Sequence, residues 1–86
     1  MIEVTCDVSS SGPAPRPVGH VAPELSGLIA HVSGYESLAV DAAIRGGRER
    51  VYRALLAHPL VGQHSLAAGL TDRLLAANAA HLAWAR

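Results

Sequence analysis

The 86 residues suffice for one domain, and a chain of this length buries only about 60% of the surface that its unfolded form exposes. Seven arginines balance seven carboxylates to a formal charge of zero, and there is no lysine, which argues against a nucleic-acid-binding protein. Half of the residues are hydrophobic, mainly alanine and leucine with no phenylalanine, which favours closely packed helices over a thick sheet sandwich.

The cysteine content and the pattern of apolar residues predict the cellular compartment. A single cysteine, Cys6, cannot form an internal disulfide. The sequence shows no basic-then-apolar leader and no run of about 18 apolar residues that would span a membrane. We therefore expect a cytoplasmic protein.

Residues 2–8 alternate between apolar and polar side chains, which is the pattern of a half-buried strand. A lone strand cannot satisfy its own backbone, so it needs a partner. Residues 17–20 follow the turn-rich stretch 9–15 and could complete a short hairpin. Otherwise the strand pairs with another chain.

The next segment predicts a long helix over residues 23–45. Pro23 suits the first helical turn, and apolar residues recur at steps of three and four. Gly27 and Gly34 interrupt this pattern and are interpreted as points of close helix approach. Residues 46–47, both glycine, end the helix.

Two further helices are predicted over residues 48–57 and about 65–84. The first stops before Pro59, because the residue preceding proline is pushed out of helical geometry. Ser65 is expected to cap the second. Trp84, near its end, is expected to fold back onto the other helices.

These elements predict a mainly α fold. It consists of a three-helix, bundle-like domain over residues 23–86, preceded over residues 1–22 by one strand, or a short hairpin, and a connector rich in proline, glycine and serine. One strand followed only by helices indicates a fragment of a larger α+β domain.

Candidate chemical groups are few. Five histidines suggest a metal site, but His58 and His64 flank a proline turn, no pair lies at the i, i+4 step, and Cys6 has no second cysteine. His31, Tyr35 and Glu36 lie within about one helical turn and could transfer protons. These three residues are better explained by a buried Tyr35 whose hydroxyl bonds to a backbone group or to an arginine. We assign no catalytic, cofactor-binding or metal-binding residue.

Several blocks in this order resemble the C-terminal end of glycoside hydrolase family 4, and within it the 6-phospho-β-glucosidases. They are the Ile-Glu-Val start, the Pro-Val-Gly connector at 17–23, the Tyr-Glu-x-Leu-x-Val-x-Ala-Ala helix at 35–43, the Ala-His-Pro-Leu-Val turn at 57–61, and the Leu-Leu-x-Ala-Asn helix at 74–78. The resemblance covers essentially the whole chain.

The resemblance implies a parent enzyme that hydrolyses 6-phospho-glycosides by oxidation and elimination, with NAD on a Rossmann domain and a divalent metal, typically manganese. The family segments that hold these groups precede the part seen here. Cys6 is followed by Asp7 rather than by the family's metal-binding motif, and Thr5 stands where the family usually has proline. The resemblance therefore assigns no cofactor to this chain.

The resulting prediction is a structural or oligomerisation portion of a 6-phospho-β-glucosidase-like protein, inactive alone. Its partners would be a second copy of itself or the preceding region of the parent, and neither nucleic acid nor membrane. One alternative is a free-standing helical module for protein interaction or homodimerisation. Another is a small domain that binds a phosphorylated metabolite through Tyr35, Tyr52 and a cluster of arginines at positions 45, 48, 50 and 53.

Overall fold

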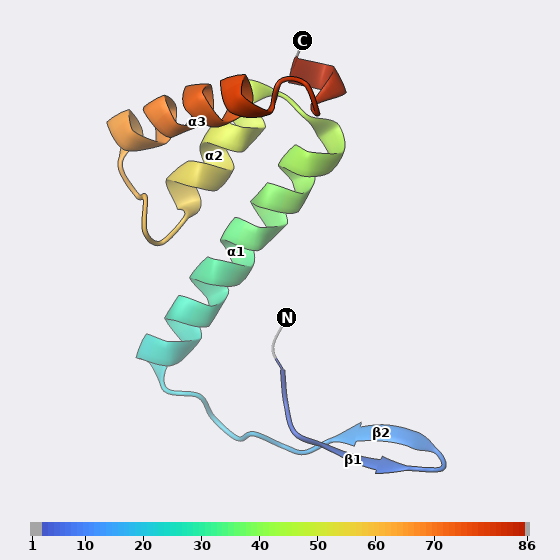
Figure 1. Cartoon of the computed structure of the whole chain (residues 1–86). Coiled ribbons are helices and arrows are strands. Elements are labelled where there is room, and N and C mark those ends of the chain that lie inside the picture. The colour runs from blue at the N-terminus through green and yellow to red at the C-terminus, as the bar shows by residue number, and fades with distance from the viewer. Residues whose placement is uncertain (1–2, 86) are drawn as a thin grey trace.

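The computed structural model describes residues 3–85. Its elements, in chain order (Figure 1), are β1 (Cys6–Ser9), β2 (Gly12–Pro15), α1 (Pro23–Arg45), α2 (Arg48–Ala57), α3 (His64–Asn78) and the short 3-10 helix η1 (Ala83–Ala85). This arrangement of helices after an N-terminal hairpin confirms the predicted fold class.

The hairpin is antiparallel, with Cys6 opposite Pro15 and Ser9 opposite Gly12. The predicted strand over residues 2–8 is confirmed only at residues 6–8, because β1 begins at Cys6. Its predicted partner over residues 17–20 is wrong, because β2 lies inside the stretch interpreted as a turn. Residues 1–2 lie outside the described part of the chain. The reversal needs only two serines, because the Ser9 hydroxyl accepts the N–H of Ser11 at 3.2 Å and Gly12 takes a φ of 107°.

Helix α1 occupies the residues for which the sequence predicts it. Pro23 lies in its first turn, and its end is fixed by Gly46, whose N–H donates to the carbonyl of Ala42. Gly46 and Gly47 have φ angles of 67° and 97°, a region that side chains with a Cβ avoid. The sharp reversal into α2 follows from these two glycines.

Helix α2 also has its predicted bounds, whereas α3 begins and ends at other residues than predicted. Ser65 does not cap α3, because the helix begins at His64 and its N-cap residue is Gln63. It ends at Asn78 rather than near residue 84. The side-chain amide of Asn78 donates to the backbone carbonyl of Leu74, and the backbone carbonyl of Asn78 accepts the N–H of His81. The chain thus turns early and returns through η1.

The helices form a thin layer. Helix α2 packs on both α1 and α3 (Figure 1), and the smallest dimension of the molecule is 16 Å, little more than the roughly 10–12 Å diameter of one helix. Within residues 3–85 the buried side chains are small: Ala42, Ala54, Ala67 and Thr71. Such residues let helices approach closely but enclose little apolar volume.

Much of the apolar surface is therefore uncovered. The large side chains that remain exposed are Val8, Val18, Leu25, Leu28, Ile29, Leu38, Val40, Ile44, Leu60, Leu66 and Leu74. The interpretation of Gly27 and Gly34 as points of close approach is wrong, because a Cβ at either position meets nothing within 4 Å. They lie on the first half of α1, which extends beyond α2 (Figure 1). Over residues 3–85, no helix has the length and hydropathy to cross a membrane.

Candidate functional site

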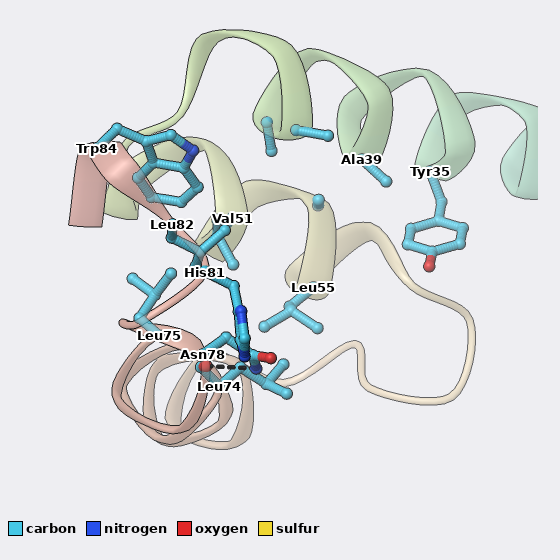
Figure 2. Close-up of a pocket in the computed structure, with 13 residues that line it drawn as sticks. Tyr35, Ala39, Val51, Leu55, Leu74, Leu75, Asn78, His81, Leu82 and Trp84 are labelled. Carbon is cyan, nitrogen blue, oxygen red and sulfur yellow. Dashed lines mark hydrogen bonds between the residues drawn. The ribbon is translucent and has the colours of Figure 1, made fainter.

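An apolar groove of about 360 Å³ lies between α1, α2, α3 and the C-terminal segment. Figure 2 shows its lining, in which hydrocarbon side chains predominate and Asn78 and His81 supply polar groups at one end. Its residues are Tyr35, Ala39, Ala42, Ala43, Val51, Ala54, Leu55, Leu74, Leu75, Asn78, His81, Leu82 and Trp84. Such a lining suits an apolar side chain from another segment better than a charged metabolite.

Trp84 closes one end of this groove. Its indole lies directly on Gly46, in the space that a Cβ at that position would fill. The early end of α3 makes this contact possible, since the turn after Asn78 returns the chain toward the start of α2. The predicted folding-back of Trp84 is confirmed.

Three histidines organise the connection between α2 and α3. His31 lies 2.7 Å through Nε2 from the carbonyl of Ala57, in the last turn of α2, whose terminal carbonyls lack helical partners. His58 accepts the N–H of Leu60 through Nδ1 at 3.1 Å. His64 pairs through Nδ1 with the hydroxyl of Tyr52. These contacts give the histidines a structural function.

The proton-transfer arrangement considered for His31, Tyr35 and Glu36 is not assembled. His31 is directed to α2, and the Tyr35 ring packs edge-on against the ring of His58, with centroids 4.5 Å apart. Glu36 is exposed and lines a separate depression on α1, outside the groove. Tyr35 is half-buried and lines the groove, so its main contribution is packing.

The arginine cluster is neutralised by neighbouring carboxylates. Arg45 and Arg50 both reach Asp41, at 2.9 and 3.2 Å, and Arg53 reaches Glu49 at 2.8 Å. Arg48 bonds to Asp72 of α3 at 2.7 Å. A phosphate would have to compete with these carboxylates, so the cluster is not arranged as an anion site.

Two of the surface ion pairs shift the ionisation of their members. The Arg48 guanidinium, hydrogen-bonded to Asp72, lowers the pKa of that carboxyl below its usual value of 3.8, and the same bond raises the pKa of Arg48. On the hairpin, a bond to Asp7 raises the pKa of Arg16. All of these side chains are exposed, so the pairs contribute little to folding.

A metal site finds no ligand set in residues 3–85, where no three His, Cys, Asp or Glu side chains are grouped to hold an ion. Cys6 is exposed on β1, with its thiol 3.6 Å from the carbonyl of Val4. His58 and His64 contact Leu60 and Tyr52 respectively.

The groove itself was missed by sequence reasoning. Helix α3 lines it through Leu74, Leu75 and Asn78. Its closure depends on Trp84 meeting Gly46, a contact between residues 38 positions apart (84 − 46). The available signal was a glycine pair at a helix end together with a single tryptophan expected to fold back.

Residues 1–61 match the family 4 glycosyl hydrolase C-terminal domain. This segment includes the hairpin, α1 and α2, and therefore the part of the groove that α1 and α2 supply.

Three curated relatives align with most of the chain. The chain is 31% identical over 81 residues to a probable 6-phospho-beta-glucosidase of Bacillus subtilis, an alignment that covers 94% of this chain. It is 35% identical over 78 residues to the phospho-alpha-glucosidase PagL of Clostridium acetobutylicum, and 31% identical over 78 residues to the maltose-6'-phosphate glucosidase of Fusobacterium mortiferum, each covering 91% of this chain.

The alignments span only 18% of the length of each of these relatives. The similarity therefore concerns one segment of much longer proteins. No solved structure matches the chain.

Proposed function

Because the chain belongs to the family 4 glycosyl hydrolase C-terminal domain, we propose that it is the structural and oligomerisation portion of a 6-phospho-β-glucosidase-like glycosidase, without catalysis of its own. The parent reaction would be the NAD- and metal-dependent hydrolysis of 6-phospho-glycosides by oxidation and elimination. A cytoplasmic setting is part of this proposal.

The observation that carries the proposal is the uncovered apolar surface. The groove is open, and Val40 and Ile44 of α1, outside it, are 57% and 77% exposed. Exposed apolar surface of this extent marks an interaction site rather than a water-facing exterior. In a parent enzyme, the preceding region would cover it.

The residues of this chain do not fit the parent's cofactors. Manganese needs a set of converging ligands, and residues 3–85 contain no such cluster. NAD is bound by a glycine-rich turn between a strand and a helix, a motif that the sequence lacks. NAD and the metal would belong to other segments of the parent, and we assign this chain no step in the reaction.

The names of the relatives support a phosphorylated glucoside as the parent substrate. One relative is named as a 6-phospho-beta-glucosidase, one as a phospho-alpha-glucosidase and one as a maltose-6'-phosphate glucosidase. The parent's preference for an α or β linkage is therefore left open in this proposal.

A chimera tests the structural function. In the Bacillus subtilis relative, the segment aligned with this chain is deleted in one variant and replaced by the 86 residues in another. We expect the deletion to abolish hydrolysis of a 6-phospho-β-glucoside and the replacement to restore it. A deletion variant that is folded and fully active would overturn the proposal.

The isolated chain provides the second test. Titration with NAD, Mn²⁺ and a 6-phosphoglucoside should give no saturable binding, because the groove is apolar and the arginines are paired. Saturable binding of any of the three by the chain alone would contradict the assignment.

The alternative is a free-standing homodimerisation module. The observation in its favour is the hairpin, which stands clear of the helices with both strands exposed (Figure 1). This function differs from the first in the chimera test, because a module with no function in the parent enzyme would not restore its activity.

A further inference from the structure

The ladder of the hairpin defines which backbone groups face outward. Arg16 donates its N–H to the carbonyl of Thr5 at 2.9 Å, in continuation of the β1–β2 register. Bonded and non-bonded pairs alternate along an antiparallel ladder, so Asp7 and Ala14 form the next bonded pair. The residues between these pairs direct their N–H and C=O groups away from the hairpin.

The outward-facing residues differ between the two strands. On β1 they are Cys6 and Val8, each with an N–H donor and a C=O acceptor. On β2 they are Pro13 and Pro15, which have no N–H. An incoming strand can therefore form a regular ladder with β1 and cannot do so with β2.

The same positions give the hairpin an apolar face. Side chains of directly opposite residues lie on one face of a sheet, so Cys6 and Val8 share a face with Pro13 and Pro15. Val8 is 81% exposed, and the other three are exposed as well. A strand that joins β1 would thus bring apolar side chains onto an uncovered apolar face.

We propose that β1 pairs antiparallel with β1 of a second copy of this chain, about a two-fold axis at Cys6. In this register Val4 lies opposite the partner's Val8, and Thr5 lies opposite the partner's Asp7. Apolar residues therefore meet apolar residues, and no like charges are directly opposed. Asp7 is already paired with Arg16 of its own chain.

This self-complementarity is the reason to name a second copy as the occupant of the edge. The hairpin also stands clear of the helices (Figure 1), so the helical layer does not cover its β1 edge. The inference rests on the proposed oligomerisation function and specifies the surface that performs it.

Sedimentation equilibrium of the 86-residue chain over a range of concentrations tests the pairing. We expect a reversible dimer. Val8→Pro removes an outward N–H and keeps the bonds within the hairpin, so it should weaken the dimer at least about tenfold, since two hydrogen bonds are lost per dimer. Ser10→Pro, in the turn of the same hairpin, retains the outward N–H groups and should leave the dissociation constant unchanged.

Amide hydrogen exchange supplies a local readout. The N–H groups of Cys6 and Val8 should become protected as concentration rises, whereas the N–H of Asp7, bonded within the hairpin, should have the same protection at all concentrations. In the dimer, bis-maleimidoethane should link the two Cys6 thiols, because the register places them opposite each other.

A monomer at all concentrations, or a dimer that Val8→Pro does not weaken, would overturn the proposed pairing. Activity of the chimera together with a monomeric chain would leave the structural function standing and reject only the pairing. A strand of the parent enzyme would then be the occupant of the edge.

Discussion

The two halves of α1 have similar residues and different surroundings. In the second half, Ala42 is only 5% exposed because α2 packs against it. In the first half, Leu25 and Leu28 are both 56% exposed, since this half extends beyond α2 (Figure 1). The helical period is the same in both, so burial here depends on whether a neighbouring helix reaches that part of α1 and on the face where the residue lies, since Ile44 in the second half is exposed.

The comparison separates two functions of apolar residues in one helix. Those that α2 covers, such as Ala42, stabilise the isolated chain, because they leave water when it folds. Those that α2 does not cover remain in water, and they include Leu25 and Leu28 in the first half and Ile44 in the second. They gain stabilisation only when another surface covers them. The variants below test this division, from the largest expected effect to the smallest.

Ala42→Leu should destabilise the chain by about 1–3 kcal/mol, because the larger side chain does not fit between α1 and α2. Ala30→Leu, an exposed position in the first half, should change stability by less than about 0.5 kcal/mol. Urea unfolding followed by circular dichroism measures both. Equal losses in the two variants would remove the distinction between the halves.

Glycine variants sharpen the same comparison. Gly46→Ala should cost about 1–2 kcal/mol, because φ is 67° there, and should also displace Trp84, whose indole occupies the place of the new Cβ. Gly27→Ala meets open space within the helix and should stabilise by about 0.5–1 kcal/mol.

The fluorescence of Trp84, the only tryptophan in the chain, reports the displacement directly. Its emission should shift to longer wavelength in Gly46→Ala and stay unchanged in Gly27→Ala. An unshifted spectrum in Gly46→Ala would show that the indole does not depend on this glycine.

Leu28→Ser should change the stability of the isolated chain by less than about 0.5 kcal/mol, because the side chain is already in contact with water. In the active chimera the same change should lower thermal stability if the parent enzyme covers this half of α1. The two measurements together decide whether the first half of α1 is an interface. Loss of stability in the isolated chain would contradict the exposed position.

The smallest effect is expected from the ion pair between α2 and α3. Arg48 lowers the pKa of Asp72, so the folded form binds that proton less readily than the unfolded form. The stabilisation is complete above the unfolded value near 3.8 and is lost as pH falls through the lowered pKa. Unfolding midpoints of the wild type and Asp72→Asn should therefore differ slightly at neutral pH and converge in acid, and 1 M salt should reduce the difference.

The helix ends that the sequence predicts well are those set by local backbone chemistry. Pro23 begins α1, residues 46–47 end it and Pro59 ends α2, and each of these effects acts within a few residues. The sequence places the end of α3 too late, because the residues on both sides of Asn78 within 76–80 are helix-forming alanines. No glycine or proline marks the end there, and the bond from the Asn78 side chain to Leu74 is seen only in the structure.

The hairpin and the groove show two other limits. Residues 9–15 have the composition of a turn, yet two serines suffice for the reversal of the chain. The prolines belong to β2, where they occupy positions whose backbone N–H would make no hydrogen bond within the hairpin. The groove requires the path of the chain after Asn78, which brings Trp84 to Gly46. Contacts at that separation depend on packing rather than on local propensity.

The prolines of β2 also bear on how far the chain can aggregate. A sheet formed through two β1 strands would have a β2 strand at each outer boundary, and Pro13 and Pro15 provide no N–H there for a further strand. Growth would stop at two molecules, so a chain with so much exposed apolar surface would avoid forming fibrils by its strands. Replacement of both prolines by threonine would open this boundary to continued polymerisation.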